Sequence, residues 1–123
     1  MTVRDISNKV IGAAMEVHSA LGPGLLESAY EGSLCAELTE MNISFDRQKV
    51  LPVIYKEKEI DCGYRIDLLV ENELIVELKS CETLLPIHEA QLLTYLKLSG
   101  VKVGLLINFN VLRLKNGIKR MVH

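Results

Sequence analysis

Three charged residues on two apolar segments form the strongest chemical signal in this sequence. Between Arg65 and Ser80 the chain reads RIDLLVENELIVELKS, in which Asp67 stands alone and a single residue separates Glu77 from Lys79. The residues around them are mostly branched and aliphatic, which is typical of strands. Burying a charge is costly unless it is paired or binds a metal. These three charged groups therefore need a chemical explanation.

The apolar pattern predicts a hairpin with one favoured register. If Val70 pairs with Leu74 around a turn at residues 71–73, one side of the hairpin is wholly apolar: Ile66, Leu68, Val70, Leu74, Val76 and Leu78. A shift by one residue loses that clean face. The favoured register places Asp67 opposite Glu77, with Cβ atoms roughly 4.5–5.5 Å apart, and Lys79 on their face. Opposed carboxylates repel one another, so we expect a hard divalent cation, Mg²⁺ or Mn²⁺, between them.

Two helices are predicted before the hairpin. Thr2 and Asp5 form a capping box that opens the first helix, and the residues Gly22-Pro23-Gly24 end it. The second helix is predicted from about Leu25 to Met41. Glu27 lies at the start of its apolar stripe, which allows two interpretations. It is either a carboxylate of a site or an acidic first-turn residue that complements the helix macrodipole.

A third helix is predicted after the hairpin, from Pro86 to about Ser99, with Gly100 as its cap. On this helix His88, Gln91 and Tyr95 are spaced three and four residues apart, so they share one face. A polar stripe on a helix this apolar is either its solvent side or the wall of a site.

The remaining segments are predicted to be strands. Residues Lys49–Tyr55 form a strand that Pro52 interrupts, which suggests an edge position. Residues Val103–Asn108 are apolar enough for a buried strand. Residues Val111–Leu114 and Ile118–Val122 are predicted to form a closing hairpin.

Composition limits the class of protein. The 123 residues, 49% of them apolar, suit one domain with a core of its own and argue against disorder. No apolar run reaches the ~18 residues that a membrane span needs. The N-terminus, MTVRDISNK, is charged where a signal peptide would be apolar, and the three cysteines fit neither a zinc nor a disulfide pattern. We therefore expect a cytoplasmic protein.

The net charge of −2 is unevenly distributed. Residues 101–123 contain five basic and no acidic side chains: Lys102, Arg113, Lys115, Lys119 and Arg120. This basic end is compatible with a face that tracks a phosphate backbone. It is equally compatible with a solvated edge strand that Lys and Arg protect from pairing.

In their order and spacing, these motifs resemble the PD-(D/E)xK nuclease superfamily, in the RecB-like branch that carries a QxxxY helix after the ExK strand. More closely, GLLESAY at residues 24–30 resembles the signature of the small GxxExxY protein family, which is assigned to that superfamily. The stretches RIDLLV, VELKS, HEAQLLTYLKLSG and VGLLINF also match the family pattern. The Pro of the superfamily name is absent, since Tyr64-Arg65-Ile66 precedes Asp67. The resemblance implies one α/β domain over residues 1–123, with a restriction-endonuclease-like core in which helices flank a mixed central sheet.

The resemblance also implies a metal site at the hairpin. Asp67 and Glu77 would be the metal ligands, helped by the backbone carbonyl of Leu78. Lys79 would orient or activate the attacking water and stabilise the charge that develops on the phosphorus oxygens. Glu27 would supply a helix carboxylate that holds a metal-bound water or a second ion.

Three further side chains are implicated less directly. Gln91 and Tyr95 would brace the site or contact the substrate. In RecB-like nucleases a His on the first-motif helix can also reach the metal, and His18 is the matching residue here. From its own position, on an apolar helix face, His18 is more typical of a packed side chain.

The function implied is that of a metal-dependent nuclease, which hydrolyses phosphodiester bonds with DNA as the expected substrate. One alternative is a weakly active or inactive module of the same fold that binds nucleic acid or a protein partner. A third hypothesis is a structural subunit in which the charges merely pair with one another. Because so small a chain has little surface with which to grip a duplex, a symmetric homodimer is also expected.

Overall fold

The computed structural model describes residues 1–123 and begins with the two predicted helices, α1 (Val3–Leu21) and α2 (Glu27–Glu40). The capping box is confirmed: the Thr2 hydroxyl accepts from the Asp5 N–H, and the Asp5 carboxylate accepts from the Thr2 N–H. Gly22 and Gly24 then adopt φ values of 69° and 96°. Glycine reaches these angles readily because it has no Cβ, so the predicted break is confirmed and α2 begins at Glu27.

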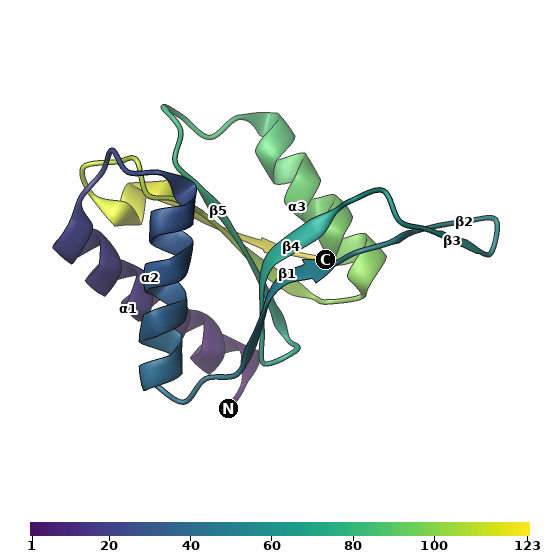
Figure 1. Cartoon of the computed structure of the whole chain (residues 1–123), viewed down its shortest axis with the longest axis horizontal. Helices are drawn as coiled ribbons and strands as arrows, with labels where there is room; N and C mark the ends of the chain where they lie inside the picture. The colour runs from purple at the N-terminus through teal and green to yellow at the C-terminus, as the bar shows by residue number, and fades with distance from the viewer.

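A mixed five-stranded sheet forms the centre of the molecule (Figure 1). Its strands, in spatial order, are β1 (Phe45–Val50), β4 (Arg65–Val70), β5 (Leu74–Lys79), β6 (Val103–Asn108) and β7 (Ile118–Val122). The strands β5 and β6 are parallel, and the other neighbours are antiparallel. The crossover between the two parallel strands is α3 (Pro86–Ser99), as expected for a parallel connection.

Helices cover both faces of this sheet, which confirms the predicted α/β class (Figure 1). The helices α1 and α2 pack on the face that carries Leu68, Val76 and Leu105. The helix α3 packs on the opposite face through Leu92 and Leu96. None of the helices has the length and apolar content that crossing a membrane requires.

The hairpin of β4 and β5 has the predicted register over its turn half. Leu68 pairs with Val76, Leu69 with Ile75 and Val70 with Leu74. Beyond these pairs the two strands diverge and the ladder stops. One detail of the prediction is wrong: Ile66 joins the core beneath α3 rather than the apolar side shared with Leu68. The strand leaves its partner at this point, so strict alternation no longer fixes its faces.

Two other segments differ from the sequence-based prediction. The stretch Lys49–Tyr55 is not one strand, because Pro52 separates the edge strand β1 from β2 (Val53–Tyr55). With β3 (Lys58–Ile60), β2 forms a ribbon that projects from the body (Figure 1).

The predicted closing hairpin is also wrong, because the partner of Ile118–Val122 is β6. Residues Val111–Leu114 form no strand, and a short 3-10 helix, η1 (Leu114–Gly117), begins at the last of them. A Cβ at Gly117 would overlap the carbonyl oxygen of Asn108. This close approach brings the chain directly back onto β6.

Candidate active site

The point where β4 and β5 diverge is filled by carboxylates. The Asp67 N–H donates to Glu77 Oε2 at 2.7 Å, and the Leu78 N–H donates to Asp67 Oδ2 at 2.8 Å. Each side chain therefore satisfies a backbone donor that the interrupted ladder leaves unpaired. We call this site, made of Asp67, Glu77 and Leu78, the fork. The structure thus brings the two acidic residues together, through hydrogen bonds to each other's strand.

Burial makes the two negative charges of the fork unfavourable. Glu77 is only 5% exposed. Burial, and then the neighbouring charge of Asp67, raise the pKa of Glu77 to about 8. Burial also raises the pKa of Asp67 above its usual value, although the hydrogen bond from Leu78 opposes this. Without a further cation, burial and the charge of Asp67 therefore favour the protonated form of Glu77.

Lys79 lies near the fork but does not neutralise it through an ion pair. Its charge lowers the pKa of both acids, yet it is absent from the four ion pairs of the molecule. The hypothesis of a self-paired charge cluster required such a pair. The ammonium group is instead free to contact something outside the protein.

The fork offers oxygen ligands of the kind that Mg²⁺ and Mn²⁺ prefer. Glu77 Oε1 has no hydrogen-bond partner in the protein, and no fully buried polar side-chain atom is unsatisfied, so this oxygen is not completely sealed from solvent. The Leu78 N–H points toward Asp67, and a strand residue directs its C=O to the same side as its N–H. No group of three or more His, Cys, Asp or Glu side chains is arranged around one ion. Two carboxylates, a carbonyl and several waters nevertheless suit Mg²⁺, which retains water when bound.

Glu27 approaches the fork from α2 without joining it. It is the exposed first residue of that helix, and its charge contributes to the raised pKa of Glu77. Glu27, Asp67 and Glu77 do not form a three-carboxylate cluster that could hold one ion. This position suits a carboxylate that acts on water or on a second ion.

The turn that positions Glu27 is held by Tyr30. The Tyr30 hydroxyl accepts from the Leu25 N–H at 3.1 Å and donates to the Gly22 carbonyl. Ser80, directly after β5, donates from its hydroxyl to the Leu25 carbonyl at 2.6 Å. These bonds tie the start of α2 to the end of the strand that carries Glu77.

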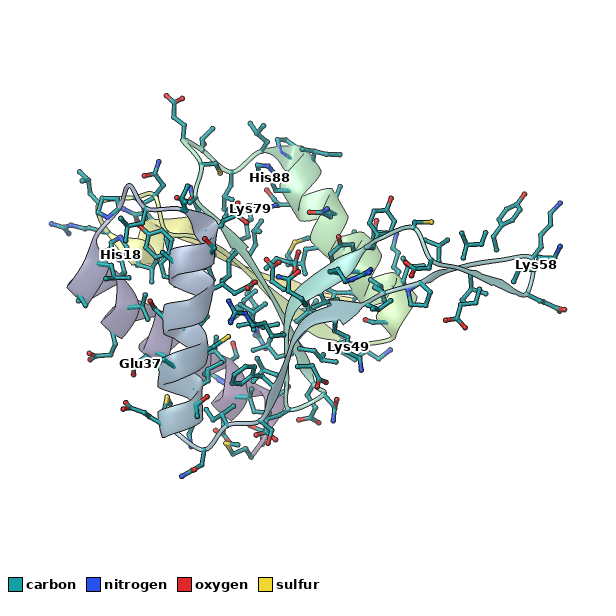
Figure 2. The ribbon with its side chains drawn as sticks, viewed as in Figure 1. His18, Glu37, Lys49, Lys58, Lys79 and His88 are labelled. Carbon is teal, nitrogen blue, oxygen red and sulfur yellow. The ribbon has the colours of Figure 1, made fainter.

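A cavity of about 430 Å³ lies beside Lys79 and against α3. Gln91 and Tyr95 line it, and Gln91 Nε2 donates to the Tyr95 hydroxyl at 3.2 Å. Burial, and then the charges of Glu77 and Asp67, raise the pKa of Tyr95, which shows how near the fork lies. The polar stripe of the third helix is thus the wall of a cavity rather than a solvent face. Figure 2 shows Lys79 and His88, which both line this cavity, between β5 and α3.

A family model described as the PD-(D/E)XK nuclease superfamily matches residues 4–121. The chain belongs to this superfamily. Its members are generally nucleases and typically use divalent metal ions. Neither the search of curated proteins nor the search of solved structures gave a match.

His18 is the one predicted candidate that the structure keeps away from the fork of this PD-(D/E)XK domain. Its Nε2 lies 2.7 Å from the Val111 carbonyl oxygen, and its ring packs near Phe109. Figure 2 shows His18 on the side of α1, well apart from Lys79. The packing interpretation therefore accounts for His18.

Three polar residues next to the fork escaped the sequence-based prediction. Gln48 Nε2 donates to Asp67 Oδ1 at 3.2 Å and to Glu31 Oε1 at 2.6 Å. Arg47 Nε donates to the other Glu31 oxygen at 2.8 Å. The one available signal was that Glu31 lies four residues after Glu27, on the same helical face. Its partners on β1 become apparent only when β1 is placed beside β4.

Proposed function

We propose that this protein is a nuclease that uses Mg²⁺ or Mn²⁺ to hydrolyse phosphodiester bonds, with DNA as its substrate. The single observation that carries the proposal is the environment of the Glu77 carboxyl group. This carboxylate is buried beside the carboxylate of Asp67, and no ion pair compensates it. Such an arrangement is costly unless a cation completes it. Membership of a superfamily of metal-dependent nucleases supports the same conclusion.

The ion would be held by Asp67, Glu77 and the carbonyl of Leu78. When bound, it would supply Lewis-acid polarisation of the phosphodiester and lower the pKa of water. The Lys79 ammonium, which has no carboxylate partner, would orient the attacking water and stabilise negative charge on the phosphorus oxygens. Glu27 would hold water, or a second ion, from the side of α2.

In this proposal, the substrate strand binds in the cavity beside Lys79. Gln91 and Tyr95 form part of its wall, next to the fork. In the proposal they brace the site and contact the nucleic acid. The basic C-terminal residues contribute less, because β7 is an edge strand and Lys119 pairs with Glu89 at 3.4 Å. This observation favours edge protection over phosphate tracking for Lys119.

The alternative of an inactive binding module differs from the nuclease in turnover alone. Two experiments separate the nuclease from the binding module. The first follows thermal unfolding as Mg²⁺ or Mn²⁺ is titrated, and the second measures nicking of plasmid and cleavage of labelled single-stranded DNA and RNA. Stabilisation by Mg²⁺ or Mn²⁺ with cleavage of DNA supports the nuclease. Stabilisation without cleavage of any substrate contradicts the nuclease and leaves the binding module, and the absence of both effects contradicts any metal site.

Lys79→Ala is the variant that isolates the chemical step. We expect cleavage to fall about 10²–10³-fold, as when one stabilising donor of a transition state is removed. Metal-induced stabilisation should persist, because Lys79 is not a ligand. Lys97→Ala, which removes an exposed lysine from α3, is the matched control and should cut like the parent. Equal cleavage by the Lys79 variant would show that its assigned role is wrong.

The homodimer remains part of the proposal on grounds of size alone. Measurement of the particle mass in solution, with and without a short duplex, tests it. A monomer in both conditions would contradict it without affecting the nuclease proposal.

A further inference from the structure

We propose that Gln48 is a positioning residue for the metal site, which holds the Asp67 carboxylate in its ion-binding orientation. This inference rests on the proposed metal site at the fork. It adds a contact from the edge strand β1, which supplies none of the proposed ligands.

The backbone at Gln48 is the first observation. Six residues other than glycine have positive φ, and Gln48, at 53°, is the only one of them inside a strand. The register of β1 against β4 runs without a shift on both sides of it, from Arg47 with Leu68 to Lys49 with Ile66. Gln48 itself stands opposite Asp67 and is the one β1 residue that forms no ladder pair. The unusual backbone therefore coincides with the position that faces a proposed metal ligand.

This conformation favours glycine, because a Cβ is crowded where φ is positive. A chain selected only for folding would place Gly at this position and a regular pair opposite Asp67. Sparsely populated backbone conformations occur preferentially at functional sites. The side chain of Gln48 therefore must contribute something that the strand alone does not.

The hydrogen bonds show what that contribution is. The Nε2 group of Gln48 has two hydrogens, and both have carboxylate acceptors, one on Asp67 and one on Glu31. Rotation of the amide by 180° would direct its carbonyl oxygen toward two anions. The other oxygen of Glu31 accepts from Arg47, so Glu31 is itself fixed. Glu31, which Arg47 holds in place, therefore fixes the orientation of the Gln48 amide.

The consequence for Asp67 is a carboxylate held at both oxygens. Oδ2 accepts from the Leu78 N–H, and Oδ1 accepts from Gln48. Each carboxylate oxygen has two lone pairs, so Oδ1 keeps one free for an ion. Partners of this kind orient metal ligands, and their loss typically reduces metal affinity about 10–100-fold.

Substitution by glycine separates this role from a structural one. Gln48→Gly removes the amide and at the same time relieves the positive φ. We expect the metal-free variant to unfold at the parent temperature or higher, while its dissociation constant for Mn²⁺ rises about tenfold or more. Titration calorimetry measures the dissociation constant, and circular dichroism measures unfolding, since the chain has no Trp.

The matched control is the neighbouring Lys49→Gly. Lys49 is exposed and forms a regular ladder pair, so its replacement should lower the unfolding temperature and leave Mn²⁺ affinity unchanged. If Mn²⁺ affinity merely followed thermal stability, Lys49→Gly would bind Mn²⁺ more weakly than Gln48→Gly. Gln48→Met, which keeps the length of the side chain without its amide, should lose affinity like Gln48→Gly.

Each outcome of these titrations decides a definite point. If the parent binds Mn²⁺ and both Gln48 variants bind it with the parent dissociation constant, the inference is wrong while the proposed function stands. If the parent binds no Mn²⁺, the metal site itself is wrong, and the role of Gln48 with it.

Discussion

The two ends of the β4–β5 hairpin use the same pair of strands in opposite ways. At the turn end, the backbones pair with each other, and side chains such as Leu74 and Val76 are fully buried in the core. At the fork, the backbones separate, and Asp67 and Glu77 replace the missing ladder bonds with their carboxylates. A site is formed where regular pairing ends, because backbone donors and ionisable side chains can then meet.

Asp67 and Glu77 of the fork therefore each have a structural role and a chemical role. A carboxylate that satisfies a buried N–H contributes to the fold, yet its own burial raises its pKa. A residue at the turn end contributes to the fold only. Variants at the two ends should therefore separate stability from metal binding.

The largest effect is expected from Asp67→Asn at the fork. The Asn carbonyl can still accept from the Leu78 N–H, so the fold should survive. The lost charge should abolish measurable binding of Mn²⁺ and reduce DNA cleavage about 10²–10³-fold, as measured by calorimetry and by plasmid nicking. Asp46→Asn removes the same charge from an exposed position on β1 and is the control. A fully active Asp67→Asn variant would remove the distinction between the two ends.

Leu74→Ala at the turn end should show the opposite pattern. Leu74 is fully buried, and removal of its side chain leaves a cavity that should lower the free energy of unfolding by about 2–5 kcal/mol. Denaturant unfolding followed by circular dichroism measures this change. Under conditions in which Leu74→Ala is folded, it should bind Mn²⁺ with the parent affinity. A loss of affinity as large as that of Asp67→Asn would mean that the two ends are not independent.

The third effect is a pH dependence that belongs to the fork alone. The pKa of Glu77 is about 8 in the folded protein and 4.5 as its reference value, so the folded chain retains a proton that the unfolded chain releases between these values. Glu77 should therefore lower the free energy of unfolding of the metal-free protein as pH rises across that interval, and its own contribution is at most about 1.4 kcal/mol per pH unit. Asp67 contributes in the same direction, because its pKa is also raised.

Glu77→Gln tests this assignment. The neutral amide has no such titration, so denaturant unfolding at several pH values should show a flatter profile for the variant than for the parent. Leu74→Ala should keep the parent slope although it is less stable. Identical slopes for the parent and Glu77→Gln would place the pH dependence on other groups.

The turn half of the hairpin was predictable because local patterns determine it. Alternation of apolar residues predicted the pairs around Val70 and Leu74, and the same pattern predicted Asp67 near Glu77. The divergence of the strands at Asp67, which replaces ladder pairs by carboxylate hydrogen bonds, was not predicted. Helix ends at Thr2 and Gly100 were also predictable, since capping depends on a few neighbouring residues. These features need no knowledge of which distant segments meet.

The features that escaped prediction depend on long-range placement. The contacts of Gln48 with Asp67 and Glu31 require β1 beside β4 and Glu31 of α2 next to β1, and no periodicity reveals this arrangement. The pairing of Ile118–Val122 with β6 is of the same kind, since a local turn suggested a hairpin instead. The position of Ile66 was missed because the strands diverge just where it lies.

The central claim, that Asp67 and Glu77 together hold a divalent cation, is tested most directly by calorimetric titration of Mn²⁺ near neutral pH in buffers of different ionisation enthalpy. Because the pKa of Glu77 is about 8 without metal, the parent should bind Mn²⁺ with release of close to one proton, and Glu77→Gln should bind no ion. Binding to the parent without proton release would contradict the raised pKa of Glu77, and equal binding by Glu77→Gln would contradict the central claim itself.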